Sequence, residues 1–95
     1  MPFIAVHYVY RNGSVPDRDR IRPAHRDWLG ELVRQGHVLT AGPYLDDSGA
    51  LLLLDAPDTD AAAKLLSDDP FTVAGIVTEA RYCEWKPVSG AFSEL

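Results

Sequence analysis

Cysteine is almost absent from this chain of 95 residues, in which Cys83 stands alone. A single thiol cannot form an intrachain disulfide and leaves no set of cysteines to hold zinc or an iron–sulfur cluster. The small core of such a short chain therefore has no covalent or metal support. We expect one domain over residues 1–95, in a reducing cytoplasm, with extra burial supplied by a partner surface.

Long apolar runs and an excess of basic charge are also missing. The longest purely apolar stretch, residues 50–54, is far below the roughly 20 residues of a transmembrane helix. No basic segment opens the chain as in a secretory signal, so we expect neither secretion nor membrane insertion. Nine Lys and Arg against 14 Asp and Glu give a formal charge of −5, which repels phosphate backbones. We predict no nucleic-acid partner.

Motifs for metal or phosphate-bearing groups are lacking as well. His7, His25 and His37 are scattered without the i, i+4 spacing of helical metal ligands. The Asn12–Gly13 pair lacks the further glycines and the lysine of a phosphate loop. We predict no metal and no cofactor. His7 is expected to be packed or to face a dimer partner, and His37 to be solvated.

Six segments carry secondary-structure patterns. Alternating or β-branched residues predict strands over 3–10, 37–41, 50–54 and 76–86. Helical spacing predicts helices over 22–35, with Pro23 at its first position, and over 60–66, capped by Asp58 or Thr59. Asp69 and Pro70 indicate one further capped turn. The order βαββαβ predicts a ferredoxin-like α+β sandwich, a four-stranded antiparallel sheet with two helices on one face.

The other face of that sheet is predicted to be apolar. The first strand has apolar residues on both sides, and residues 51–54 are all leucine. An exposed apolar sheet face favours association, and a second copy of the same sheet is the simplest cover. We expect a homodimer formed through the sheet.

His25 is the most informative candidate for chemistry. On the predicted helix it lies near the centre of an apolar face formed by Ala24, Trp28, Leu29, Leu32 and Val33, with Arg26 on the opposite side. A position in the first turn favours the neutral imidazole, which can act as a base. The alternative is a core histidine bonded to a backbone carbonyl.

Four further residues are candidates for a site around His25. Asp69 could orient the imidazole, although helix capping alone also explains it, and Asp68 competes for either role. Arg22, with free amides at the predicted helix start, could hold an anionic group, or be solvated. Gly42 could permit close approach of a ligand or simply end a strand. Tyr8 could contact substrate or pack in the core or an interface.

The ordered motifs of this chain resemble the YciI-like (YCII-related) family. The resemblance extends from about Phe3 to Val88. Its motifs are Arg22-Pro23-Ala24-His25, Leu39-Thr40-Ala41-Gly42-Pro43, Asp68-Asp69-Pro70-Phe71 with Ala74-Gly75, and Glu84-Trp85-Lys86-Pro87-Val88.

This resemblance implies a ferredoxin-like fold, a dimer related to the muconolactone isomerase type of α/β barrel, and an active site built on a histidine and an aspartate. The motifs place these two residues at His25 and Asp69. Some members resemble enzymes that remove halide from hydroxylated chloroaromatics. We therefore hypothesise an acid–base enzyme of lyase or isomerase type that acts on a small organic molecule without a cofactor. The alternatives are a non-catalytic dimeric module that binds a small molecule or assists another enzyme, and a purely structural pair.

Overall fold

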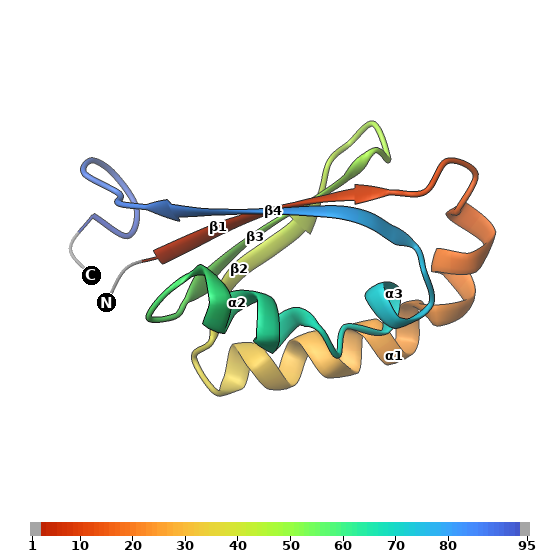
Figure 1. The fold of residues 1–95 in the computed structure, drawn as a ribbon, viewed down its shortest axis with the longest axis horizontal. Coiled ribbons are helices and arrows are strands. Elements are labelled where there is room, and N and C mark those ends of the chain that lie inside the picture. Colours follow the sequence, from red (N-terminus) through yellow and green to blue (C-terminus); the bar gives the residue numbers. More distant parts are fainter. Residues whose placement is uncertain (1–2, 94–95) are drawn as a thin grey trace.

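A four-stranded antiparallel sheet forms one layer of the protein, and three helices form the other (Figure 1). A computed structural model describes residues 3–93. The elements in chain order are β1 (Phe3–Tyr10), α1 (Val15–Arg34), β2 (Val38–Pro43), β3 (Gly49–Asp55), α2 (Thr59–Leu66), α3 (Pro70–Val73) and β4 (Val77–Trp85). The strand order β2-β3-β1-β4 places β1 in the middle. This confirms the predicted ferredoxin-like α+β fold.

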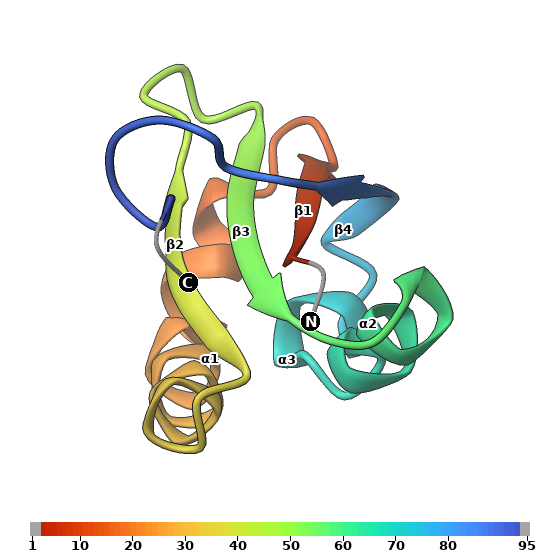
Figure 2. The same cartoon turned by 90° about the vertical axis from the view of Figure 1, so that its left-hand side faces the viewer.

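The alternation of β1 decides which of its residues enter the core. Ile4, Val6, Tyr8 and Tyr10 are all buried on the side that faces the helices. Leu52 and Leu54 of β3 belong to the same core cluster, as do Leu66 of α2 and Phe71 of α3. In Figure 2 the helices lie together beneath the sheet, with α1 under β2 and α2 toward β4.

Helix α1 is longer than its sequence pattern predicts. It begins at Val15 rather than near Arg22, so the prediction of Pro23 as the first helical residue is wrong. Pro16 occupies the first turn instead, and Pro23 lies inside the helix. Oppositely charged residues three apart, Asp17 with Arg20 and Asp19 with Arg22, pair on the added turns. The charged stretch before the predicted helix start is therefore helical.

The buried face of α1 also differs from the predicted one. Leu32 and Arg18 are buried, and Ile21, Trp28 and Leu29 pack against the core. Ala24 is exposed and Val33 is 48% exposed, so these two do not belong to the apolar face. Extending the helix toward its N-terminus also brings Arg18 into contact with Tyr10 of β1.

The other elements deviate little from expectation. Asp58 caps α2 by accepting a hydrogen bond from the Ala61 amide at 2.7 Å, and Asp69 caps α3. Strand β2 continues through Gly42 and Pro43, which were expected to end it. Because β2 lies at the edge of the sheet, a proline there is tolerated. None of the helices within residues 3–93 combines the length and apolarity of a membrane span.

The sheet face away from the helices carries exposed apolar side chains. Val9, Leu51 and Trp85 are 42%, 42% and 45% exposed on three adjacent strands. His7 lies on this face between Leu51 and Arg81, and its Nδ1 is 2.6 Å from the Tyr44 hydroxyl. The apolar character predicted for this face is therefore present.

Candidate active site

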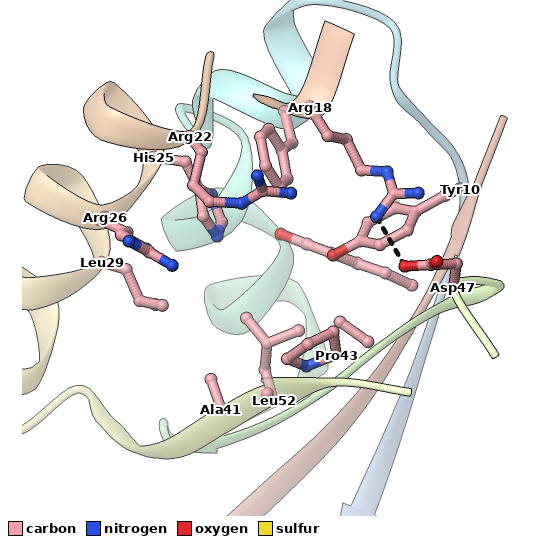
Figure 3. A pocket seen from close by; sticks show the side chains of 14 residues that line it. Tyr10, Arg18, Arg22, His25, Arg26, Leu29, Ala41, Pro43, Asp47 and Leu52 are labelled. Atoms are coloured by element: carbon pink, nitrogen blue, oxygen red, sulfur yellow. Dashed lines mark hydrogen bonds and ion pairs between the residues drawn. The ribbon is translucent and has the colours of Figure 1, made fainter. Parts of the chain in front are cut away.

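A pocket of about 220 Å³ opens between α1, α3 and the sheet (Figure 3). Its wall combines aromatic and aliphatic side chains with several cationic ones. The lining residues are Tyr8, Tyr10, Arg18, Arg22, His25, Arg26, Leu29, Ala41, Gly42, Pro43, Asp47, Ala50, Leu52 and Phe71. A mainly apolar cavity with a few converging polar groups is the usual form of a small-molecule site.

His25 and Asp69 meet at this pocket. The Nδ1 atom of His25 is 2.7 Å from Oδ1 of Asp69, although the residues are 44 positions apart. Helix α1 supplies the imidazole, and the start of α3 supplies the carboxylate where α3 packs against α1. The Asp69 side chain is fully buried, whereas that of His25 retains 14% exposure. The pair therefore has one buried end and one end at the pocket wall.

Hydrogen bonding to Asp69 determines which nitrogen of His25 faces a ligand. An ionised carboxylate only accepts hydrogen bonds, so Nδ1 must carry the proton that it shares with Asp69. In the neutral imidazole the lone pair then lies on Nε2. The His25 ring projects from α1 into the pocket in Figure 3, so this lone pair is available to a bound molecule.

Asp69 is held by two more donors. The Phe71 amide donates to Oδ1 at 2.9 Å, and the Tyr8 hydroxyl donates to Oδ2 at 2.8 Å. Burial, followed by the nearby Asp69 carboxylate, raises the pKa of Tyr8 far above its usual value. Tyr8 therefore remains a protonated donor. Tyr8 lines the pocket, but its hydroxyl donates to Asp69.

Aromatic side chains fix the plane of the His25 ring. The Phe71 ring stacks on it with centroids 4.0 Å apart and an interplanar angle of 2°. Trp28 lies 6.1 Å away on the same helix. In the sequence Phe71 was part of a motif but was not a site candidate. Its position directly after Asp69 and Pro70 was the signal that could have indicated this role.

Arg22 and Gly42, the other candidates for substrate binding, also line the pocket, but their surroundings differ from expectation. Arg22 lies within α1 and pairs with Asp19, so no free helix amides accompany it. The predicted effect of the helix start on His25 is wrong for the same reason, since the first turn of α1 is at Val15. A Cβ on Gly42 would meet nothing within 4 Å, so the protein itself leaves space there.

Several pocket residues were not site candidates in the sequence, among them Arg18, Arg26 and Tyr10. The predicted helix did not extend back to Arg18, Arg26 was placed on the opposite helix face, and Tyr10 was predicted only as a strand residue. With α1 extended to Val15, Arg18, Arg22 and Arg26 follow one another at four-residue spacing along one side of the helix (Figure 3). That periodicity was the signal that could have identified them.

A metal site would require at least three acidic, histidine or cysteine side chains close together. Across residues 3–93 no three such side chains lie close enough together. The absence of a metal or cofactor from the working protein remains a prediction. The polar groups that line the pocket are an imidazole, hydroxyls, guanidinium groups and the Asp47 carboxylate.

Comparison with known proteins agrees with the fold. The solved structure of 5-chloro-2-hydroxyhydroquinone dehydrochlorinase from Burkholderia phenoliruptrix, in complex with 2,5-dihydroxybenzoquinone, is similar with a TM-score of 0.77 and 27% identity. The similarity covers 88% of this chain and 93% of that one. No curated protein sequence matches. The family model of the YCII-related domain matches residues 1–86, and the chain therefore belongs to the YCII-related domain family.

Proposed function

We propose that this protein is a cofactor-independent acid–base enzyme in which His25 transfers protons on a small cyclic substrate. The observation that supports this proposal is the 2.7 Å contact of His25 Nδ1 with the buried Asp69 carboxylate, at the wall of an open pocket. Asp69 holds the ring in one tautomer and stabilises the imidazolium that forms when Nε2 accepts a proton. A base positioned in this way contributes roughly 10²- to 10⁴-fold to a rate.

Elimination of HX from a hydroxylated haloarene is the reaction that we favour. The similar structure is that of a dehydrochlorinase acting on a chlorinated hydroxyhydroquinone. In this scheme a proton first moves from a ring hydroxyl to the halogen-bearing carbon, which becomes tetrahedral. Loss of a second O–H proton to His25 then expels the halide with the electron pair of its bond, leaving a quinone.

The test is chloride release from 5-chloro-2-hydroxyhydroquinone under anaerobic conditions. His25→Ala is expected to lower kcat by about 10²- to 10⁴-fold. Asp69→Asn is expected to lower it as well, because an amide does not hold the Nδ1 tautomer or balance the imidazolium. Asp68→Asn is the matched control, since Asp68 is the exposed neighbour of Asp69, and its activity should stay within about twofold.

Two outcomes would contradict this proposal. One is full activity in folded His25→Ala, with folding checked by circular dichroism. The other is tight binding of the quinone product without any turnover by the wild-type protein. The second result would support the alternative of a non-catalytic module that binds a small molecule.

We also propose that the protein acts as a cytoplasmic homodimer joined through the outer sheet face. The lone Cys83 suits a reducing compartment. The exposed Val9, Leu51 and Trp85 on that face support the dimer, since a second copy would remove them from water.

A further inference from the structure

Arg18 is a buried cation at the end of the pocket away from His25. Its side chain is only 6% exposed. The Nε atom donates to the Ser14 hydroxyl at 3.1 Å, and the guanidinium carbon lies 4.6 Å from the centre of the Tyr10 ring. These contacts hold the guanidinium in one orientation along the pocket wall (Figure 3).

The charge of Arg18 is poorly balanced by the protein. Its carboxylate partner is Asp47, at the long distance of 3.4 Å, and the Asp47 side chain is 67% exposed. Much of the Asp47 charge is therefore screened by water. A buried cation is costly unless close hydrogen-bonding partners compensate it, and a guanidinium has five N–H donors to satisfy. Arg18 can accept a further anionic partner from the pocket.

The local charge of the pocket reinforces this conclusion. Arg18, Arg22 and Arg26 line it, Asp47 is the carboxylate among the lining residues, and Asp19 pairs with Arg22 outside that lining. Asp69 is fully buried beside His25 and already accepts three hydrogen bonds. A chain of net charge −5 thus places three of its nine basic residues around one cavity. Such a focused positive field favours anionic ligands.

We propose that Arg18 anchors an ionised oxygen of the substrate at the end of the pocket opposite His25. The substrate class is then a single-ring compound with a phenolate, enolate or carboxylate group remote from the proton that His25 transfers. Arg18 and His25 are seven positions apart on the helix, which corresponds to about 10 Å along the axis. A cavity of roughly 150 Å³ holds benzene, so this pocket of about 220 Å³ suits one substituted ring. The inference rests on the proposed function for the role of His25.

The experiment measures binding without turnover, by isothermal titration calorimetry at pH 7. The anionic probe is 2,5-dihydroxybenzoquinone, whose acidic enol groups are ionised, and the uncharged probe is hydroquinone. Arg18→Met is expected to raise the Kd of the anionic probe at least about tenfold and that of hydroquinone by less than about twofold. Arg20→Met is the control, because Arg20 is an exposed arginine of the same helix outside the pocket lining.

A second variant does not disturb a buried residue. Asp47→Asn removes the competing carboxylate, and asparagine tolerates the left-handed backbone at this position, where φ is 65°. We expect it to tighten binding of the anionic probe by about threefold and to leave hydroquinone unchanged. This variant keeps the proposal testable if Arg18→Met fails to fold.

The proposal is overturned if the wild-type protein does not bind the anionic probe at millimolar concentration, or if Asp47→Asn leaves its Kd unchanged. Equal weakening of both probes by Arg18→Met would show a purely structural role and would also overturn it. Arg18-dependent binding in a protein whose chloride release does not depend on His25 would support the anchor and contradict the proposed function. The two proposals can therefore fail separately.

Discussion

At the scale of single residues, Asp69 combines two roles that the sequence presented as alternatives. It caps α3 through the Phe71 amide and also hydrogen-bonds His25, using the same Oδ1 atom. Tyr8 occupies the other oxygen. Three donors around one buried carboxylate leave its charge well compensated, which is the condition for keeping a carboxylate inside a small core.

The Tyr8–Asp69 hydrogen bond gives a prediction about stability and pH. Tyr8→Phe should lower the free energy of unfolding by about 2 kcal/mol at neutral pH, because a buried hydrogen bond to a charged group is lost. The pKa of Tyr8 is raised in the folded protein, so above pH ~10 the unfolded chain loses this proton and the folded one keeps it. Wild-type stability should therefore fall there, and the gap to Tyr8→Phe should narrow by about 1.4 kcal/mol per pH unit.

Urea denaturation of both proteins at several pH values between 8 and 11 measures this gap. Burial also raises the pKa values of Tyr10 and Tyr82, but those two residues are present in both proteins and cancel in the difference. A gap that stays constant across this range would contradict the assignment of Tyr8 as the protonated donor to Asp69.

At the scale of elements, the close approach of β1 and β3 at one end depends on a glycine. Gly49 lies opposite Val9, and a Cβ placed on it would come within 1.7 Å of the Tyr8 carbonyl oxygen. Backbone cannot move away as a flexible side chain can. The start of β3 can therefore lie this close to β1 only because residue 49 has no side chain.

Substitution of Gly49 tests this contact. Gly49→Ala should lower the free energy of unfolding by about 2 to 3 kcal/mol, because the two strands must separate to admit the methyl group. The matched control is Gly30→Ala within α1, where the new methyl would have an ordinary 3.8 Å contact with Arg34. It should raise stability by up to about 1 kcal/mol through helix propensity. Thermal unfolding followed by circular dichroism compares them, and equal effects of the two substitutions would refute this account.

At the scale of the whole molecule, the two faces of the sheet have different roles. The helices cover one face (Figure 1), and the pocket opens between them and the sheet on that side. The other face presents Val9, Leu51 and Trp85 to water. A chain of this length buries a smaller share of its surface on folding than a longer chain does, so association through this face would add apolar burial.

The predicted dimer can be tested by its mass. Light scattering at micromolar concentration should give twice the 10.5 kDa of the chain. Leu51→Glu should shift the protein to monomer, because it places a charge on the outer sheet face. Val33→Glu is the control, since Val33 has similar exposure on α1 in the helical layer and should leave the mass unchanged. A monomeric wild-type protein would refute the dimer.

The sequence allowed the fold and the main pair of candidate site residues to be predicted. Strand alternation, helical spacing and the Asp58 and Asp69 caps are local signals, and the order βαββαβ limits their arrangement to few topologies. His25 and Asp69 were matched through motifs, and their contact agrees with the packing of α3 on α1. The start of α1 was missed because Pro23 is a typical first helical residue, and only the Asp and Arg pairs before it indicated otherwise.

By itself, the sequence determined the strand faces, the acidic charge, the lone thiol and the residue types available for chemistry, because these depend on composition and local spacing. Only the tertiary structure decided that Tyr8 donates to Asp69, that Phe71 stacks on His25, and that Arg18 is buried at the pocket. These contacts join residues from different elements, and a distance between elements depends on how the helices pack on the sheet. That packing makes one cationic pocket in an acidic chain.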